Sequence, residues 1–225
     1  MDLIEVMRTT PSVREFKPDP VPDDVVHAIL DVARFAPNGG NRQGWRVVVL
    51  RDPSIRAQIR DLYVLSWREY WAQVIQGLVP FAPRDNGRWT GPAIDLEAAR
   101  DTPAPNAFAD HLDTVPVLLA VVVDLGTLAV TDNGLDRQSI VGGGSVYPFC
   151  HNVLLAARNV GVGGVMTTML ARQETKAKEL LHVPDGHAIA ALLALGYPVK
   201  QVTKLRRAAV EEFTTVDRFD GDPFP

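Results

Sequence analysis

Three continuous apolar runs constrain this chain most, because each has the length of a strand and carries few polar side chains. They are Trp45–Leu50, Val115–Val123 and Ala188–Leu195. A strand without alternating polar residues is typical of a sheet that is covered on both faces. The three runs therefore predict strands inside a layered domain.

Helical patterns surround these runs. Asp2–Thr9 has apolar residues on one face, a second helix follows Pro22, and a long helix begins at Pro53. Gly164–Leu170 is predicted to be another strand and Glu174–His182 a short amphipathic helix. Because strands and helices alternate in the second half, we predict one domain built as a three-layer α/β sandwich.

The segment Ser145–Val160 is predicted to be a helix that is apolar on almost every side and ends at Gly161. A helix that is hydrophobic all round is buried. In a small protein such a helix is most easily buried between the domain and a partner, so we expect a homodimer.

Regular patterns fail between residues 77 and 113, where several prolines and the Asn86-Gly87 turn signal occur. A loop of that length in a compact domain is usually functional or mobile. We interpret it as a lid over a pocket, and a surface insertion without special use is the alternative.

Composition excludes several classes of function. The formal net charge is −4, which gives no reason to expect nucleic acid or a polybasic membrane contact. Cys150 is the single cysteine, so an intramolecular disulfide is impossible. No run of about 18 apolar residues occurs, and Met1–Glu5 does not resemble a signal peptide. We expect a cytoplasmic protein that does not contact a membrane.

Several catalytic motifs are missing from the sequence. It has no His-Glu-x-x-His pattern and no cysteine pair, so a metal site is unsupported. It has no Gly-x-Ser-x-Gly motif, and Gly142–Gly144 lacks the spacing of a dinucleotide fingerprint. We therefore expect neither a metal nor a serine nucleophile.

Three polar sets remain, and the first lies near the N-terminus. Arg8, Ser12 and Arg14 offer two guanidinium groups and a hydroxyl, a combination that suits a phosphate monoester. Arginines near a helix end also commonly face water or cap carbonyls. Spacing alone leaves both interpretations open.

The second set lies in a glycine-rich loop. Gly39 and Gly40 allow the backbone to approach a ligand closely, and Asn41 and Gln43 each carry a donor and an acceptor. Such amides match the alternating donors and acceptors of a flavin pyrimidine ring. An ordinary connection between a helix and a strand is the alternative.

The third set is the basic cluster Lys204–Arg207 on an otherwise acidic chain. A solvated surface patch is the simpler interpretation. The cluster gains a function only if it joins Arg8 and Arg14 around one phosphate.

Five segments, in this order and at these separations, resemble the nitroreductase family of FMN enzymes. They are Ser12–Phe16, Ala36–Trp45, Gly144–Arg158 with the following Gly161–Gly164, Leu195–Pro198 and Arg206–Glu212. The chain departs from the family at Thr10 and Pro11, where another arginine is usual. It also departs at Gly44 and Ala209, where proline is common.

The resemblance implies an α+β fold, a three-layer α/β/α sandwich with a mixed, mainly antiparallel sheet, in an intertwined homodimer. Residues 1–225 would form a single FMN-binding domain, with a lid at about 77–113 and a C-terminal arm at about 200–225 that reaches the partner. FMN would lie at the dimer interface, two per dimer.

The resemblance also implies a set of cofactor contacts. Arg8, Ser12 and either Arg206 or Arg207 would hold the phosphate, and Arg14 would lie nearer the ribityl chain and the flavin N1–O2 edge. The loop would place Asn38, Gly39, Asn41 and Gln43 at the pyrimidine side. The strand end Met166, Thr167 and Thr168 would pass the flavin N5 and O4.

These contacts predict an oxidoreductase that transfers hydride from NADH or NADPH to a small acceptor, such as a nitroaromatic or a quinone, by a ping-pong scheme. The cofactor carries the chemistry, so we assign no catalytic residue. The acceptor would stack beneath the lid against aromatic side chains that serve equally well as plain packing: Trp67, Tyr70, Trp71, Trp89 or Phe108. The alternatives are a flavin-holding protein with negligible turnover, and a relative that removes halogen from aromatics or fragments the flavin.

Overall fold

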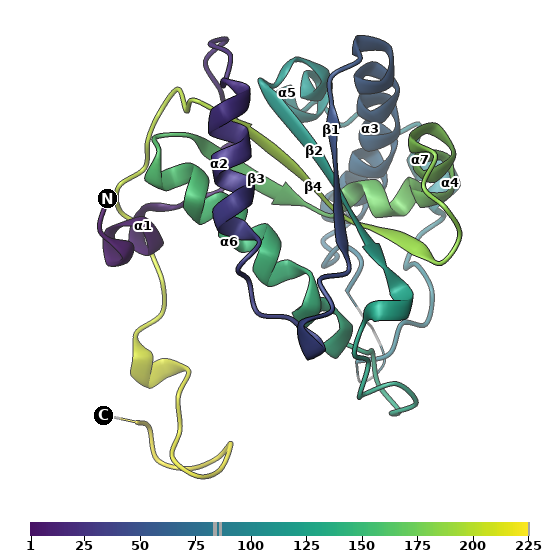
Figure 1. Cartoon of the computed structure of the whole chain (residues 1–225). Coiled ribbons are helices and arrows are strands. Elements are labelled where there is room, and N and C mark those ends of the chain that lie inside the picture. Colours follow the sequence, from purple (N-terminus) through teal and green to yellow (C-terminus); the bar gives the residue numbers. More distant parts are fainter. Residues whose placement is uncertain (83–84, 86, 225) are drawn as a thin grey trace.

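The structure is a computed structural model that describes residues 1–82, 85 and 87–224 (Figure 1). Its helices are α1 (Leu3–Thr9), α2 (Asp23–Ala33), α3 (Pro53–Ile75), α4 (Leu96–Ala99), α5 (Ala107–Asp110), α6 (Tyr147–Asn159) and α7 (Glu174–Leu181). Its strands are β1 (Trp45–Leu50), β2 (Val117–Asp124), β3 (Gly163–Thr167) and β4 (His187–Gly196). The predicted strands and long helices are thus present, with ends shifted by a few residues.

The strands form one sheet in the order β1-β2-β4-β3, and each neighbouring pair is antiparallel. Strand β2 begins two residues later than predicted, after Pro116, which has no backbone N–H to donate to the ladder. A parallel element is added by a bridge between Ser12 and Gly164. This bridge brings the N-terminal segment beside β3.

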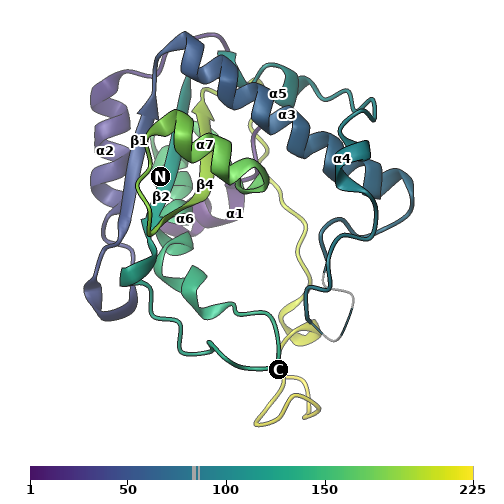
Figure 2. The same cartoon turned by 90° about the vertical axis from the view of Figure 1, so that its right-hand side faces the viewer.

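Helices cover both faces of the sheet, which confirms the three-layer architecture. Alternate side chains of the central strands point to opposite faces. Leu119 and Leu193 pack toward α2 and α6, whereas Leu118 and Leu192 pack toward α3 and α5. Figure 2 shows α2 on one side of the sheet and α3 on the other.

Helix α6 starts at Tyr147 because the residues before it, Val141–Ser145, form a 3-10 turn. It ends at Asn159, one residue before the predicted Val160. Gly161 follows with a φ of 80°, which lets the next amide return to the Ala157 carbonyl at 2.9 Å. Only one side of α6 is buried within the chain, and the side chain of His151 on the other side is exposed. That a second copy of the chain covers the exposed side of α6 in a homodimer stays a prediction.

The end of the segment from residue 77 to residue 113 lies in the hydrophobic core, and the interpretation of the rest as a lid stays a prediction. Phe108, Ala109 and Leu112 at its end are buried, and the Phe108 ring packs edge-to-face on Tyr63 at 6.1 Å. This end therefore belongs to the hydrophobic core on the α3 side. No helix in the described ranges is long and apolar enough to cross a membrane.

The two ends of the chain meet beside β3. The amide of Lys17 donates to the Tyr197 carbonyl at 2.8 Å, and the amide of Val199 donates to the Glu15 carbonyl at 3.1 Å. Beyond Lys200 the chain leaves the sandwich as an extended segment, drawn in yellow in Figure 1. Its Phe219 side chain is fully exposed.

Candidate functional site

Basic side chains from both ends of the chain line one hollow of about 460 Å³. Arg8 lies on one side, and Lys204 and Arg207 lie on the other. The C-terminal segment is held there because the Gln201 side chain donates to the carbonyl of Thr9 at 3.0 Å. The structure therefore brings the first and third polar sets together through Arg207.

Ser12 and Arg14 line a second hollow, of about 240 Å³, together with Lys200. The amide of Val13 donates to the Gly164 carbonyl at 2.9 Å, which fixes this segment against the start of β3. Among the described residues, Arg206 lines neither hollow. Arg207 is thus the better placed of the two tail arginines.

The glycine-rich loop holds its amides in a strained backbone. Gly40, Asn41 and Gln43 all have positive φ, of 62°, 53° and 51°. This region is costly for residues other than glycine, although asparagine tolerates it, and such outliers often mark functional sites. The Asn38 side chain accepts a hydrogen bond from the amide of Gln43 at 2.9 Å and so stabilises the turn.

A second contact fixes this loop to the segment before α6. The amide of Gly39 donates to the Ser145 hydroxyl at 3.2 Å. The side-chain amide of Gln43 donates to the Asn41 side chain at 3.3 Å, and both residues are exposed to solvent. Two amide side chains therefore lie side by side and are open to a ligand.

The end of β3 meets α3 and the N-terminal segment. The Tyr63 hydroxyl on α3 lies 3.1 Å from the Thr167 hydroxyl, and Thr168, the next residue, is exposed. Burial raises the pKa of Tyr63, and the Thr167 hydrogen bond and the charge of Arg14 offset part of that rise. Arg14 therefore lies close enough to act electrostatically on the end of β3.

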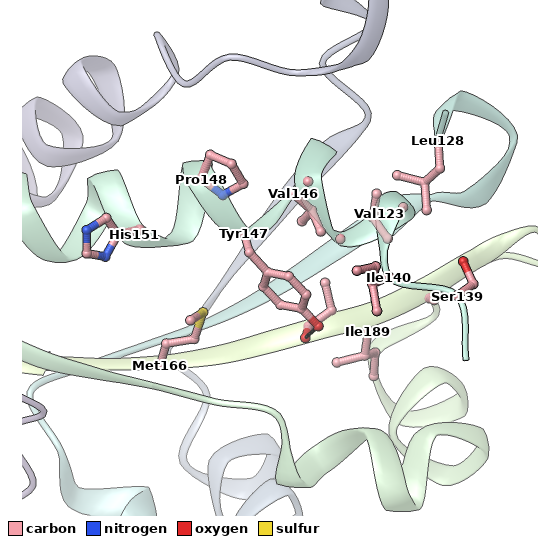
Figure 3. Close-up of a pocket in the computed structure, with 15 residues that line it drawn as sticks. Val123, Leu128, Ser139, Ile140, Val146, Tyr147, Pro148, His151, Met166 and Ile189 are labelled. Atoms are coloured by element: carbon pink, nitrogen blue, oxygen red, sulfur yellow. Dashed lines mark hydrogen bonds between the residues drawn. The ribbon is translucent and has the colours of Figure 1, made fainter. Parts of the chain in front are cut away.

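A third hollow, of about 940 Å³, extends from the exposed side of α6 to β4 and the end of β3 (Figure 3). Its lining is mainly apolar and includes Met166, Ile140 and Ile189, with His151 on α6. The Tyr147 hydroxyl donates to the Ala190 carbonyl at 3.4 Å, and burial raises its pKa. A planar apolar group fits the chemistry of such a lining.

Asp132 holds the loop that carries Ile140 to this hollow. Its carboxylate accepts hydrogen bonds from the Ile140 amide at 2.8 Å, from Arg137 at 2.7 Å and from the Ser139 hydroxyl at 2.8 Å. The Ile140 amide and then Arg137 keep the pKa of Asp132 well below its usual range. The loop is thereby ordered by a group that stays ionised at neutral pH.

The aromatic side chains predicted to form an acceptor wall separate into two groups. Trp67 stacks on Tyr70 and on Trp71, with ring centroids 5.2 and 6.3 Å away, and its indole N–H donates to the Ala104 carbonyl at 3.1 Å. Trp67 therefore joins this aromatic group to the 77–113 segment. Phe108, by contrast, lies in the core, and Trp89 is exposed.

The basic set around Arg8 and the amide set around Asn41 lie at opposite ends of α6. At its C-terminal end, the Arg158 side chain donates to the Thr9 carbonyl at 3.1 Å. At its N-terminal end, the loop contacts Ser145. A helix of 13 residues is about 20 Å long, and Figure 1 shows α1 and the loop after α2 well separated along it. The two sets are therefore separated by the length of α6, about 20 Å.

Sequence reasoning did not identify Tyr63 or Glu69, the two polar residues of α3 that reach the end of β3 and the turn after it. Nothing in their spacing separates them from other residues of a long helix. Tyr147 and His151 were also missed as lining residues, although the preceding Gly142–Gly144 run was a signal that a ligand or chain approaches closely there. In the described ranges, no group of three His, Cys, Asp or Glu side chains could hold a metal ion.

Comparison with known proteins identifies the family. The model of the nitroreductase family matches residues 7–197. The chain belongs to that family, and with it to the FMN-dependent oxidoreductases.

Relatives and structures agree with this assignment. Iodotyrosine deiodinase 1 from Rattus norvegicus is 27% identical over 213 residues, which cover 94% of this chain and 68% of the relative. NADH dehydrogenase from Thermus thermophilus is 29% identical over 206 residues, which cover 89% of this chain and 88% of the relative. The NADPH:FMN oxidoreductase of Vibrio harveyi, solved with NAD⁺, has a similar fold, with a TM-score of 0.65 and 17% identity over 97% of this chain and 78% of that one.

The donor groups of this chain fit FMN. The hollow around Arg8 and Arg207 offers guanidinium and ammonium donors for a phosphate monoester, and no carboxylate of the described part of the chain lines it. Asn41 and Gln43 offer exposed amides for a heterocycle edge. The large apolar hollow suits the flat ring system.

Proposed function

We propose that two copies of this chain bind FMN between them, each site taking its phosphate contacts from one copy and its pyrimidine contacts from the other. The observation that carries the proposal is the separation of the two sets by the length of α6, while Arg8 and Arg207 share one hollow. Pairing two copies with α6 at the interface is the arrangement that closes both sites.

Within such a site the residues have distinct tasks. Arg8, Lys204 and Arg207 hold the phosphate, and Ser12 adds a hydroxyl donor. Arg14 would supply a cation near the end of β3, where it would stabilise negative charge on the N1–O2 edge of the flavin. The backbone of Thr167 and Thr168 offers donors to the edge of the ring.

FMN, when bound, supplies the redox chemistry, taking hydride from NADH or NADPH and passing electrons to the acceptor. The chain supplies orientation and an apolar surface for the two substrates in turn. Trp67, Tyr70 and Trp71 on α3, together with the backbone at Ala104, form the wall against which an aromatic acceptor stacks.

The proposal leads to two classes of electron acceptor. Nitroaromatics and quinones are the first, because the family contains nitroreductases and the site needs no nucleophile. Halogenated phenols are the second, because the iodotyrosine deiodinases match 90% or more of this chain. Steady-state rates with a nitroaromatic, a quinone and iodotyrosine, with NADPH as donor, distinguish them. A rate no faster than that of free FMN with all three would instead identify a flavin-holding protein.

Hybrid dimers test the shared site. One chain carries Arg8→Met and Arg207→Met, and the other carries Asn41→Gly and Gln43→Gly, which keep the positive φ while removing the amides. Each variant homodimer is expected to lose FMN. The hybrid is expected to hold one FMN, because one of its two sites combines only unaltered sets.

A hybrid without FMN would show that each site is built within one chain. Homodimers that keep their flavin would show that the contacts are misassigned. Differently tagged chains, purified over both tags, give the hybrid, and absorbance against protein concentration gives its flavin content.

A further inference from the structure

A buried carboxylate joins three segments beside the candidate site. The side chain of Glu69, on α3, has no exposed surface. Its Oε1 accepts a hydrogen bond from Arg100 at 2.8 Å, and its Oε2 accepts one from Arg172 at 3.0 Å. Gln173 also donates to Oε1, at 3.3 Å. Both carboxylate oxygens are therefore satisfied by donors from outside α3.

The donors come from two functionally different places. Arg100 follows α4 in the 77–113 segment. Arg172 and Gln173 end the 3-10 turn Met169–Gln173, which begins directly after Thr168. The Glu69 carboxylate thus contacts two segments. One is the 77–113 segment, through Arg100, and the other is the turn that follows Thr168, a proposed flavin contact.

A second buried side chain extends the network to the start of the 77–113 segment. Gln73, one turn further along α3, donates to the Glu69 carbonyl at 3.0 Å and accepts a hydrogen bond from the Phe81 amide at 3.1 Å. The Arg172 guanidinium lies 5.1 Å from the centre of the Phe81 ring. The start and the later part of the segment are therefore tied to one buried cluster.

Such a cluster couples its members. A buried carboxylate is costly unless its oxygens are paired, and losing one partner leaves an uncompensated charge that the other must satisfy. The side chains of Arg100 and Arg172 are about one-third exposed, so each can leave the carboxylate for water, whereas the buried Glu69 cannot. Departure of either arginine therefore alters the contact of the other.

We propose that Glu69 is a positioning residue that couples the order of Leu96–Arg100 to the position of the turn after Thr168. When Leu96–Arg100 is in place, Arg100 and Arg172 share the carboxylate, and the end of β3 is held where it meets the cofactor. The role of Thr167 and Thr168 rests on the proposed function, and the coupling itself does not.

Hydrogen exchange on the flavin-free protein tests the coupling. Arg100→Met removes the donor in the 77–113 segment, and Arg172→Met removes the donor in the turn. The matched control is Arg51→Met, which breaks an exposed ion pair with Asp23. Each test variant is expected to accelerate exchange about ten-fold or more in both Leu96–Ala99 and Met169–Gln173, because charged hydrogen bonds are lost. Acceleration confined to the substituted segment would overturn the proposal.

Kinetics of the flavin-loaded enzyme test the consequence. Arg100→Met is expected to raise the acceptor KM and lower kcat while FMN content stays that of the parent, and Arg100→Lys is expected to restore part of both. Unchanged kcat with a raised KM would confine Arg100 to acceptor binding and would contradict positioning through Glu69. If the protein binds no FMN, the proposed function fails, and the exchange experiment still decides the coupling.

Discussion

The Tyr63 hydroxyl lies 3.1 Å from the Thr167 hydroxyl and so joins the middle of α3 to the last residue of β3. The two residues are 104 positions apart in the chain. Because Thr167 Oγ1 also accepts from the Met169 amide at 3.4 Å, the hydrogen bond sets the direction in which the chain leaves the sheet.

Tyr63→Phe removes this bond with little change in shape. We expect a loss of about 1 kcal/mol in the free energy of unfolding, the usual net value of a neutral hydrogen bond. We also expect weaker FMN binding, because Thr167 and Thr168 become less well fixed. Urea unfolding and flavin titration measure the two effects. Tyr197→Phe, at a half-buried tyrosine that packs on the α2–α6 side of the sheet, is the control. Equal flavin affinities in both variants would remove Tyr63 from the site.

Arg207 and Arg206 are adjacent and chemically identical, yet only Arg207 lines the hollow with Arg8. Arg207→Met is therefore expected to raise the Kd for FMN about 10- to 100-fold, the loss typical of charged hydrogen bonds. Arg206→Met is the matched control and should change the Kd less than three-fold, a difference within the context dependence of a surface charge. A larger increase in the Kd for Arg206→Met than for Arg207→Met would place Arg206 on the phosphate.

Gly44 stands where the family commonly has proline, and Thr127 explains why a side chain is excluded. A Cβ added at Gly44 would overlap the Thr127 hydroxyl and lie 2.9 Å from its Cβ. Gly44→Ala should destabilise the fold by about 1–3 kcal/mol through overpacking. Adding Thr127→Gly should recover part of that loss of stability. Thermal unfolding of the two single variants and the double variant gives the interaction free energy between the two positions. Additive losses would show that the two residues do not compete for this space.

Burial raises the pKa of Cys150 to about 12, from an ordinary value of 9.0. The folded state therefore holds this proton more tightly than the unfolded state, so the contribution to stability is complete below pH 9 and falls as the pH rises toward 12. At pH 10.5 the free energy of unfolding is expected to be about 2 kcal/mol lower than below pH 9 because of this thiol. Urea unfolding of the parent and of Cys150→Ala at pH 8 and pH 10.5 measures it. Parallel losses in the two proteins would show that Cys150 does not titrate in this way.

The amino-acid sequence by itself determined the layers and several of their boundaries. Strand and helix patterns are local, so the apolar run Trp45–Leu50 and the glycine stop at Gly161 follow from a few neighbouring residues. The family motifs also select Arg14 and Asn41 as binding candidates, because residue type and spacing limit what such side chains can bind.

Tertiary structure alone decided which of these side chains meet. Arg8 and Arg207 share a hollow because Glu15 and Val199 pair across the sheet edge, a long-range contact that no local pattern encodes. The burial of Phe108 in the core, and the convergence of Arg100 and Arg172 on Glu69, likewise depend on how distant segments pack. A hydrogen bond or an apolar contact is short-ranged in space and indifferent to distance along the chain, so the folded arrangement is needed to reveal it.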